Sequence, residues 1–271
     1  MKPVVVLFDV DETLVHTGGA GARSWKAAFD KLYGIPADIG EHSSAGETDP
    51  QVARATFKGV LGRDPSVDEL AKLYAQYLLV LADDIWTSKE YRVLPGAEQT
   101  LVLLGAAGVM LGLVSGAMEG AARTKLMPAN LNRFFIFGAY GSDSPDRSEL
   151  TKLAIDKATR LHDGLTAAEV YVVGDTPHDI EATKAAGAMS VGVASGHYSI
   201  EELTAADAQL LGRVTYNGFA QAWPTMAGAN EFADKMNAMP KYVVSVRAGS
   251  VGSIRAPDPG VPSGVLMVCH S

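Results

Sequence analysis

The stretch Val4-Val5-Val6-Leu7-Phe8-Asp9-Val10-Asp11-Glu12-Thr13 decides the fold of this chain. Its first five residues form a continuous apolar run, which is typical of a short strand buried on both faces of a parallel sheet. Asp9 and Asp11 follow the run directly. Open α/β sheets bind ligands at the carboxyl ends of their strands, so two acids stand at a candidate site. Alone this pattern is weak, because aspartate is common in turns.

Strand and helix patterns alternate along the chain after residue 109. Apolar runs typical of strands lie at 109–114, 134–137, 170–173 and 190–194. Helical patterns separate them at 119–126, 149–161 and 179–186. This alternation predicts an α/β fold with a doubly wound, Rossmann-like parallel sheet.

Between the first two strands the chain is helical instead. Apolar residues recur with helical spacing, and Ser66 followed by Glu69 is a typical helix start. We therefore expect residues 16–94 to form an inserted all-helical domain. Residues 1–15 and 95–211 would then form the core domain.

Polar residues also mark the ends of later strands. Ser115 and Gly116 follow the second strand, Arg147 precedes a helix, and Asp175 and Asp179 follow a later strand. A serine can hydrogen-bond a phosphate oxygen, an arginine can neutralise it, and clustered carboxylates suit Mg²⁺. Each residue also has an ordinary structural explanation, as a loop serine, a surface arginine or a helix cap. The chance occurrence of the whole set in this order is far less probable than that of any single residue in it.

As a set, these residues resemble the haloacid dehalogenase superfamily across about residues 1–208. The family pattern is a strand ending in DxDx[TV], a strand ending in Ser or Thr, a Lys or Arg, and a strand ending in GDxxxD. The matching residues are Asp9, Asp11, Thr13, Ser115, Arg147, Asp175 and Asp179.

The resemblance implies a magnesium-dependent phosphatase. Asp9 would form an aspartyl-phosphate intermediate, and Asp11 would protonate the leaving group and then activate water. Mg²⁺ would be held by Asp9, the Asp11 carbonyl and Asp175, with Asp179 in support. Catalysis and phosphate binding would further involve Thr13, Ser115, Gly116 and Arg147.

The helical insertion resembles the cap of the phosphoglycolate-phosphatase-like branch. The segment Gly46-Glu47-Thr48-Asp49 falls where that branch has its substrate loop. Glu47, Thr48 and Arg23 are therefore weak candidates for substrate contacts, although they are equally explained as ordinary surface residues.

Two positions depart from the family pattern. The third motif is usually lysine, whereas the best-placed residue here is Arg147; Lys152, one turn later, is the alternative. Arginine keeps the charge and adds bidentate geometry, so we expect activity to survive. Glu12 stands where glycine is commoner and adds negative charge near the site.

The C-terminal extension, residues 212–271, has a different character. Residues 207–245 resemble an internal piece of the dihydrofolate-reductase-like domains of the riboflavin pathway, with most of the nucleotide-binding part missing. Beyond about residue 246 the chain is rich in Gly, Pro and Ser, and we expect an irregular tail. Our hypothesis is a fusion in which residues 207–211 supply the last strand of the sheet. The alternative is a genuine extension that packs on the core or mediates dimerisation.

Composition excludes some partners and favours others. A net charge of −8 argues against nucleic-acid binding, which needs a basic face. A single cysteine, Cys269, allows no intrachain disulfide and favours a cytoplasmic protein. We expect no signal peptide and no membrane span, because no apolar run approaches ~20 residues. The oligomeric state stays open.

The expected reaction is hydrolysis of a phosphate monoester on a small phosphorylated metabolite. A sugar-phosphate mutase would use the same nucleophile and stays open, as does a non-catalytic binding protein on the same scaffold. A dehalogenase is disfavoured, because it needs neither the second acid nor Mg²⁺. A phosphonatase is disfavoured, because no matching cap lysine is evident. The sequence does not identify the metabolite.

Overall fold

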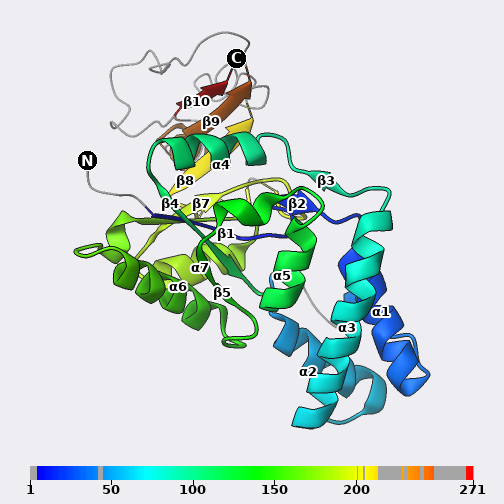
Figure 1. Cartoon of the computed structure of the whole chain (residues 1–271). Coiled ribbons are helices and arrows are strands. Elements are labelled where there is room, and N and C mark those ends of the chain that lie inside the picture. Colours follow the sequence, from blue (N-terminus) through cyan, green and yellow to red (C-terminus); the bar gives the residue numbers. More distant parts are fainter. Residues whose placement is uncertain are drawn as a thin grey trace.

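The structure is a computed structural model, and it describes residues 5–41, 45–199, 201–203, 205–212, 228, 231–238, 241–246 and 267–270. Its centre is an eight-stranded sheet in the order β10-β9-β8-β7-β6-β1-β4-β5 (Figure 1). The strands are β1 (Val5–Phe8), β4 (Met110–Ser115), β5 (Phe137–Tyr140), β6 (Val170–Gly174), β7 (Met189–Gly192), β8 (Ala208–Gly212), β9 (Lys241–Val246) and β10 (Met267–His270). Every neighbouring pair is parallel. The predicted α/β fold with a doubly wound parallel sheet is confirmed.

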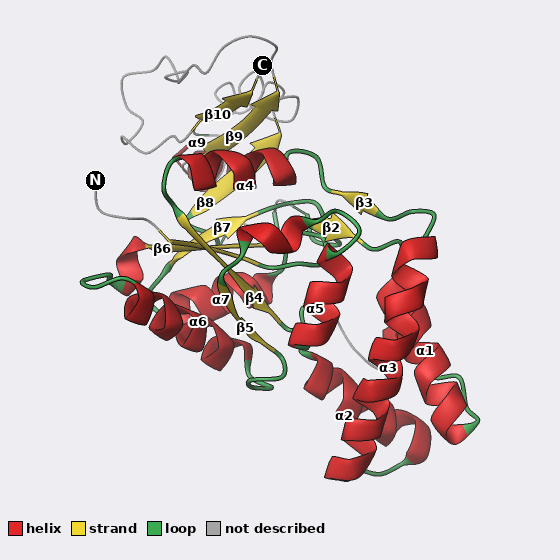
Figure 2. Cartoon of the chain, in the orientation of Figure 1, coloured by secondary structure: helices red, strands yellow, loops and turns green. Residues whose placement is uncertain are grey.

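The central strand β1 is buried on both faces, as its continuous apolar run predicts. Val6 and Phe8 belong to one hydrophobic cluster, and Val5 and Leu7 belong to another. Successive side chains of a strand point to opposite faces, so each face of the sheet has its own core. The two layers of helices are α4 (Ala97–Ala106) with α5 (Glu119–Leu126), and α6 (Arg147–Leu161) with α7 (Pro177–Ala185) (Figure 2).

One predicted strand is displaced along the chain. Residues 131–134 form a 3₁₀ turn, and β5 begins only at Phe137. Asn130, at the start of that turn, has a positive φ of 53°. The apolar run at 134–137 therefore belongs partly to a turn, because apolar content alone does not distinguish a strand from a buried turn.

The three α-helices between residues 17 and 91 pack beside the sheet (Figure 1). They are α1 (Ala20–Tyr33), α2 (Asp49–Leu61) and α3 (Val67–Thr87). The predicted start of α3 is confirmed, because the Glu69 N–H donates to Ser66 Oγ and the Ser66 N–H donates to the Glu69 carboxylate. Trp25, Phe29 and Phe57 are fully buried in the cluster that also contains Phe8 of the sheet. These helices therefore share a hydrophobic core with one face of the sheet.

Two short strands join this helical unit to the sheet. β2 (Val15–His16) and β3 (Arg92–Val93) pair antiparallel, and the Leu94 N–H donates to the Leu14 carbonyl. The chain thus leaves and re-enters the sheet layer at one place. Such a two-strand connection positions the helices over the carboxyl end of β1.

The C-terminal part corrects one expectation. β8 pairs with β7 as predicted, but it is not the last strand of the sheet. β9 pairs with β8, β10 pairs with β9, and α9 (Glu231–Ala238) precedes them. The prediction of an irregular tail is therefore wrong at residues 267–270, because the open edge of β9 offers backbone donors and acceptors to a further strand. Residues 213–227 and 247–266 lie outside the described part, as does much of the reductase-like stretch.

Candidate active site

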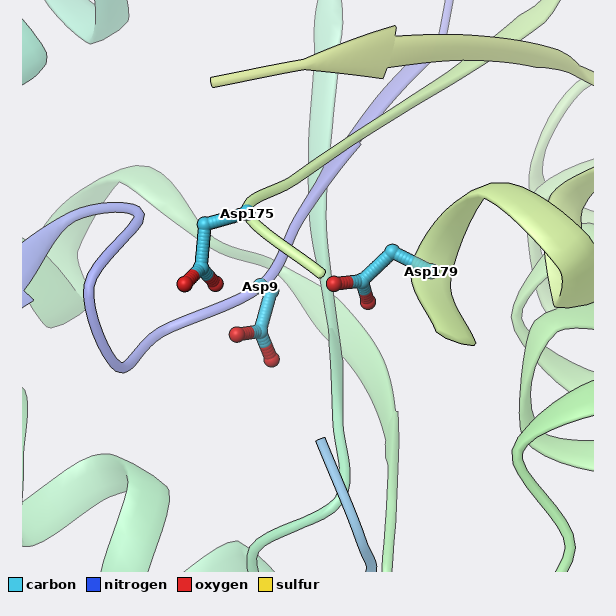
Figure 3. Close-up of side chains that lie close together, drawn as sticks. All are labelled: Asp9, Asp175 and Asp179. Atoms are coloured by element: carbon cyan, nitrogen blue, oxygen red, sulfur yellow. The ribbon is translucent and has the colours of Figure 1, made fainter. Parts of the chain in front are cut away.

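Three buried carboxylates meet at the carboxyl ends of two neighbouring strands (Figure 3). Asp9 directly follows β1, Asp175 directly follows β6, and Asp179 lies in the first turn of α7. One oxygen from each lies within 4.8 Å of the others, and all three residues are at most 6% exposed. The structure thus brings Asp9 together with two acids that lie more than 160 residues later in the sequence.

The start of α7 places Asp179 in this cluster. Thr176 is the N-cap residue: its Oγ1 accepts the Asp179 N–H, and its own N–H donates to Asp179 Oδ2 at 3.1 Å. Gly174 leaves the necessary space, because a Cβ there would lie 2.3 Å from Asp179 Cγ. Asp179 is therefore both part of a capping box and part of the acidic cluster.

Arg147 is the cation of the cluster. It is the first residue of α6, and its Nη2 lies 3.0 Å from Asp9 Oδ1 while its Nε donates to Asp179 Oδ1 at 3.0 Å. Burial alone would lower its pKa, but Asp179 and Asp9 outweigh burial and raise the pKa above its ordinary value. Lys152, the alternative, is half-exposed and pairs with Glu149 at 3.1 Å on the surface of α6.

The cluster carries more negative charge than its arginine balances. Burial raises the pKa of Asp9 to about 7; Arg147 opposes this, while Asp179 and Asp11 add to it. Burial, with the charges of Asp9 and Asp179, raises the pKa of Asp175 to about 9. Several hard oxygen donors in one buried, electron-rich site are the ligand set that divalent cations such as Mg²⁺ prefer. The residues present therefore fit a divalent cation.

The other residues of the predicted motifs lie around the cluster. Thr13 Oγ1 donates to Asp175 Oδ1 at 3.4 Å. Ser115, at the end of β4, is buried, and its Oγ accepts the Ala117 N–H at 3.3 Å. A Cβ on Gly116 would lie 2.8 Å from Arg147 Nη1, so this loop passes close to the arginine.

Asp11 has a separate partner, which sequence reasoning missed. Its Oδ2 lies 2.5 Å from the Nζ of Lys125, a buried residue of α5. Lys125 is four residues after the buried Ala121 and next to the buried Leu126. A lysine on the apolar face of a short helix is the signal that would have found it.

The segment 46–49 contacts the loops that follow β4 and β5. The Gly46 carbonyl accepts from Arg147, Thr48 Oγ1 donates to the Pro145 carbonyl at 2.9 Å, and the Asp49 N–H donates to the Gly116 carbonyl at 2.8 Å. The Thr48 hydroxyl is thus used in a hydrogen bond to the neighbouring loop, and the Glu47 carbonyl oxygen would lie 2.8 Å from a Cβ on Gly116. Substrate contacts of Glu47 and Thr48 stay predictions.

Arg23 does not join them. It lies on α1, half-exposed, and pairs with Asp84 of α3 at 2.8 Å. The ion pair with Asp84 joins two helices, α1 and α3, and gives Arg23 a structural role; its contact with a substrate stays a prediction.

The backbone conformation of Glu12 explains why glycine is commoner at this position in the family. Its φ of 54° is left-handed, a conformation that costs a non-glycine residue about 1–2 kcal/mol. Its carboxylate lies 2.6 Å from His16 Nδ1, and its carbonyl accepts from the Ser195 hydroxyl. The side chain is thus held by its neighbours and does not enter the acidic cluster.

The fold and the site together define a protein with a parallel α/β sheet, a buried carboxylate cluster at the strand ends and a helical segment inserted after the first strand. The model of the haloacid dehalogenase-like hydrolases matches residues 4–187. The chain belongs to this family. Within the described ranges, no helix is long and apolar enough to cross a membrane.

Relatives extend over most of the chain. A phosphoglycolate phosphatase of Rhodospirillum rubrum is 30% identical over 247 residues, which cover 88% of this chain and 97% of the relative. A probable phosphatase, IndB, of Dickeya dadantii is 27% identical over 221 residues, covering 78% and 89%. These relatives place the chain among the phosphatases of the family.

Solved structures share the fold at lower identity. CbbY from Rhodobacter sphaeroides, solved with phosphate, has a TM-score of 0.61 at 17% identity and covers 77% of this chain and 93% of its own. A hydrolase from Pseudomonas syringae has a TM-score of 0.59 at 22% identity, covering 76% and 92%. At these identities the likeness concerns the fold alone.

Proposed function

We propose that this enzyme hydrolyses phosphate monoesters of small metabolites by nucleophilic attack of Asp9, with Mg²⁺ as cofactor. The observation that carries the proposal is the place of Asp9, buried at the end of the central strand and paired with Arg147 at 3.0 Å. A carboxylate is a weak nucleophile in water, and a preorganised, water-poor site makes it effective.

In the first half of the reaction, an Asp9 oxygen attacks the phosphorus of the substrate. The bond between Asp9 and phosphorus forms while the bond from phosphorus to the ester oxygen breaks. Asp11 gives its proton to the departing oxygen, so the alcohol leaves neutral. The product of this half is an aspartyl phosphate and a free alcohol.

In the second half, water attacks the phosphorus of the aspartyl phosphate. Asp11, now a carboxylate, takes a proton from the water, and the bond between phosphorus and Asp9 breaks. Inorganic phosphate leaves, and Asp9 is restored. One acid thus serves first as proton donor and then as base.

Three groups would hold the phosphoryl oxygens. Ser115 Oγ accepts an N–H from Ala117, an arrangement that leaves its own proton for a phosphate oxygen. Arg147 offers a planar cation whose side chain is only 11% exposed. The backbone after Ser115, at Gly116, can approach closely because it has no side chain. These donors favour the charge that spreads over the phosphoryl group in flight.

Asp9, Asp175 and the Asp11 carbonyl would hold Mg²⁺, with Asp179 in support. The bound ion would neutralise charge on the phosphoryl group and on the attacking carboxylate. One Asp179 oxygen lies within 4.8 Å of an oxygen of Asp9 and an oxygen of Asp175, which supports its place in the set.

The pH dependence of stability tests the metal site. Asp9 and Asp175 have pKa values of about 7 and about 9 when folded, against an ordinary 3.8. The folded state therefore binds more protons than the unfolded state above about pH 4, and metal-free stability should fall as the pH rises toward 9. Saturating Mg²⁺ should raise the melting temperature by about 5–10 °C at pH 8 and far less at pH 5. An equal shift at both pH values would count against this site.

Labelling tests the covalent step. Inorganic phosphate should be released from p-nitrophenyl phosphate with Mg²⁺, and EDTA should stop the release. Acid quenching during turnover of a radiolabelled phosphate ester should leave label on the tryptic peptide that contains Asp9, and hydroxylamine should remove it. Robust turnover with no labelled peptide, even when quenched within one turnover, would contradict the mechanism. The names of the relatives make phosphoglycolate the first metabolite to assay.

The division of the chain belongs to the same proposal. Residues 16–94 act as the cap, residues 1–15 and 95–211 as the core, and residues 212–271 as an extension. The site lies at β1, β4 and β6, whereas β9 and β10 continue the sheet at its far edge. A cytoplasmic location would suit a small phosphorylated substrate.

Truncation after Gly212 tests that division. We expect kcat/KM within about twofold of the full chain, since no site residue is removed. Self-association should increase, because β8 then becomes an open edge; size-exclusion chromatography would show it. A loss of turnover in protein that still melts cooperatively would show that the extension contributes to the site.

A further inference from the structure

A buried lysine lies where the core and the cap meet. Lys125 of α5 is 6% exposed, and its Nζ lies 2.5 Å from Asp11 Oδ2. Lysine is seldom buried, because removing its charge from water costs several kcal/mol unless opposite charge compensates. Lys125 is therefore buried at a cost in stability, next to Asp11, which the proposed reaction uses first as an acid and then as a base.

The compensating groups come from two parts of the molecule. Burial alone would lower the pKa of Lys125, but the charges around it, first that of Asp11 and then that of Asp49, outweigh burial and raise the pKa above its ordinary value. Asp11 follows β1, whereas Asp49 begins α2. Lys125 thus links the acid after β1 electrostatically to a helix of the inserted segment.

Asp49 is held firmly against the core. Its Oδ2 accepts the N–H of Met118, the N-cap residue of α5, at 2.8 Å, and its own N–H donates to the Gly116 carbonyl at 2.8 Å. The same helix α5 carries Lys125 seven residues later. Seating of α2 on the core therefore places a negative charge near Lys125.

The two acids after β1 have different cations. Arg147 lies 3.0 Å from Asp9, and Lys125 lies 2.5 Å from Asp11. Two carboxylates with different tasks need separate positions, one at the phosphorus and the other at the leaving oxygen. With a single cation, both carboxylates would be drawn to the same charge.

We infer that Lys125 is a positioning residue that holds the Asp11 carboxyl at the leaving-group side of the site, and that Asp49 of the seated cap holds Lys125 in turn. The inference rests on the proposed function, because it presupposes that Asp11 is the proton donor.

Esters with different leaving groups distinguish a positioning role from a purely structural one, because a structural defect would slow all of them equally. A phenolate with two nitro groups is a weak base and departs without a proton, whereas an unsubstituted phenolate needs one. Misplacing the donor should therefore slow phenyl phosphate much more than 2,4-dinitrophenyl phosphate. The comparison uses kcat/KM, which covers the steps up to departure of the leaving group and excludes hydrolysis of the aspartyl phosphate.

The test is Lys125→Met, assayed on phenyl, p-nitrophenyl and 2,4-dinitrophenyl phosphate. We expect kcat/KM to fall about 100-fold for phenyl phosphate and at most about threefold for 2,4-dinitrophenyl phosphate, since a proton donor contributes about 10²–10⁴-fold. Lys125→Arg, which keeps the charge, should restore most of the lost activity. Lys152→Met, a surface lysine of α6, is the matched control and should leave all three values unchanged.

Other outcomes have definite meanings. An equal loss for all three esters would overturn the inference and make Lys125 a packing residue. If Lys125→Met does not melt cooperatively, Asp49→Asn replaces it as the test variant. Its loss of kcat/KM should be about tenfold greater for phenyl phosphate than for 2,4-dinitrophenyl phosphate. An equal loss for all esters, or no loss, would overturn the inference. Failure of the proposed function is distinguishable, because the wild-type enzyme would then show no turnover that depends on Asp9.

Discussion

Replacing Asp9 by asparagine should abolish turnover while leaving the protein folded. Removing a nucleophile typically costs 10⁴-fold or more, on the order of the loss seen when a catalytic serine is removed. Asparagine has nearly the same shape as aspartate, but its amide does not attack phosphorus. The measurement is kcat/KM for p-nitrophenyl phosphate with saturating Mg²⁺, together with the acid-quench label.

The fold should survive this change for an electrostatic reason. Burial raises the pKa of Asp9 to about 7, so at pH 8 the metal-free protein holds an unfavourable charge that asparagine lacks. Arg147 keeps Asp179 as its partner at 3.0 Å. We expect the melting temperature of metal-free Asp9→Asn to stay within a few degrees of wild type.

A surface aspartate supplies the control for Asp9. Asp156 is exposed on α6, and Asp156→Asn should change neither kcat/KM nor the label. Turnover of Asp9→Asn above about 1% of wild type, in freshly purified protein whose mass excludes deamidation, would refute Asp9 as the nucleophile.

Replacing Arg147 by methionine should damage both stability and activity. Its guanidinium contacts two buried carboxylates, Asp9 and Asp179. Breaking a buried ion pair by removing one partner typically costs about 3–5 kcal/mol. Activity should fall about 10²–10³-fold, the usual effect of losing one charged or hydrogen-bonding stabiliser of the transition state.

Urea unfolding at pH 8, with and without Mg²⁺, separates the two effects. Mg²⁺ should recover part of the stability of Arg147→Met, because a bound cation also neutralises the acids. It should not recover the activity, because the phosphate would still lack the guanidinium. Full recovery of kcat/KM by Mg²⁺ would show that Arg147 has only a structural role.

Two further variants sharpen the result for Arg147. Arg147→Lys keeps the charge but not both contacts, and we expect activity within about tenfold of wild type. Arg160→Met, at an exposed position of the same helix, controls for loss of a surface arginine and should be neutral. If Arg147→Met changed neither stability nor activity, the proposed role of Arg147 as the partner of Asp9 would be contradicted.

Much of the fold could be predicted because it depends on consecutive residues. The apolar run before Asp9, the capping pair Ser66 and Glu69, and the alternation after residue 109 are each local patterns. Local pattern failed at β5, where an apolar run is partly a turn, and at β10, where pairing depends on an open edge far away in the sequence. Edge pairing depends on the neighbouring strand, which a single segment does not reveal.

The sequence by itself determined which acids, serine and arginine stand at strand ends, because parallel strands bring their carboxyl ends to one edge. Only the tertiary structure decided which of them meet. It placed Arg147 rather than Lys152 beside Asp9, paired Arg23 with Asp84, and paired Asp11 with Lys125, which is 114 residues distant.

The first motif, Asp9 and Asp11, shows this difference most clearly. Its two acids are neighbours in the sequence and equal in chemistry. Packing of α5, α6 and the cap gives each acid its own cation. The physical reason is that charge interactions act through space, so the task of each carboxylate is set by the helices packed around it and not by the residues beside it in the chain.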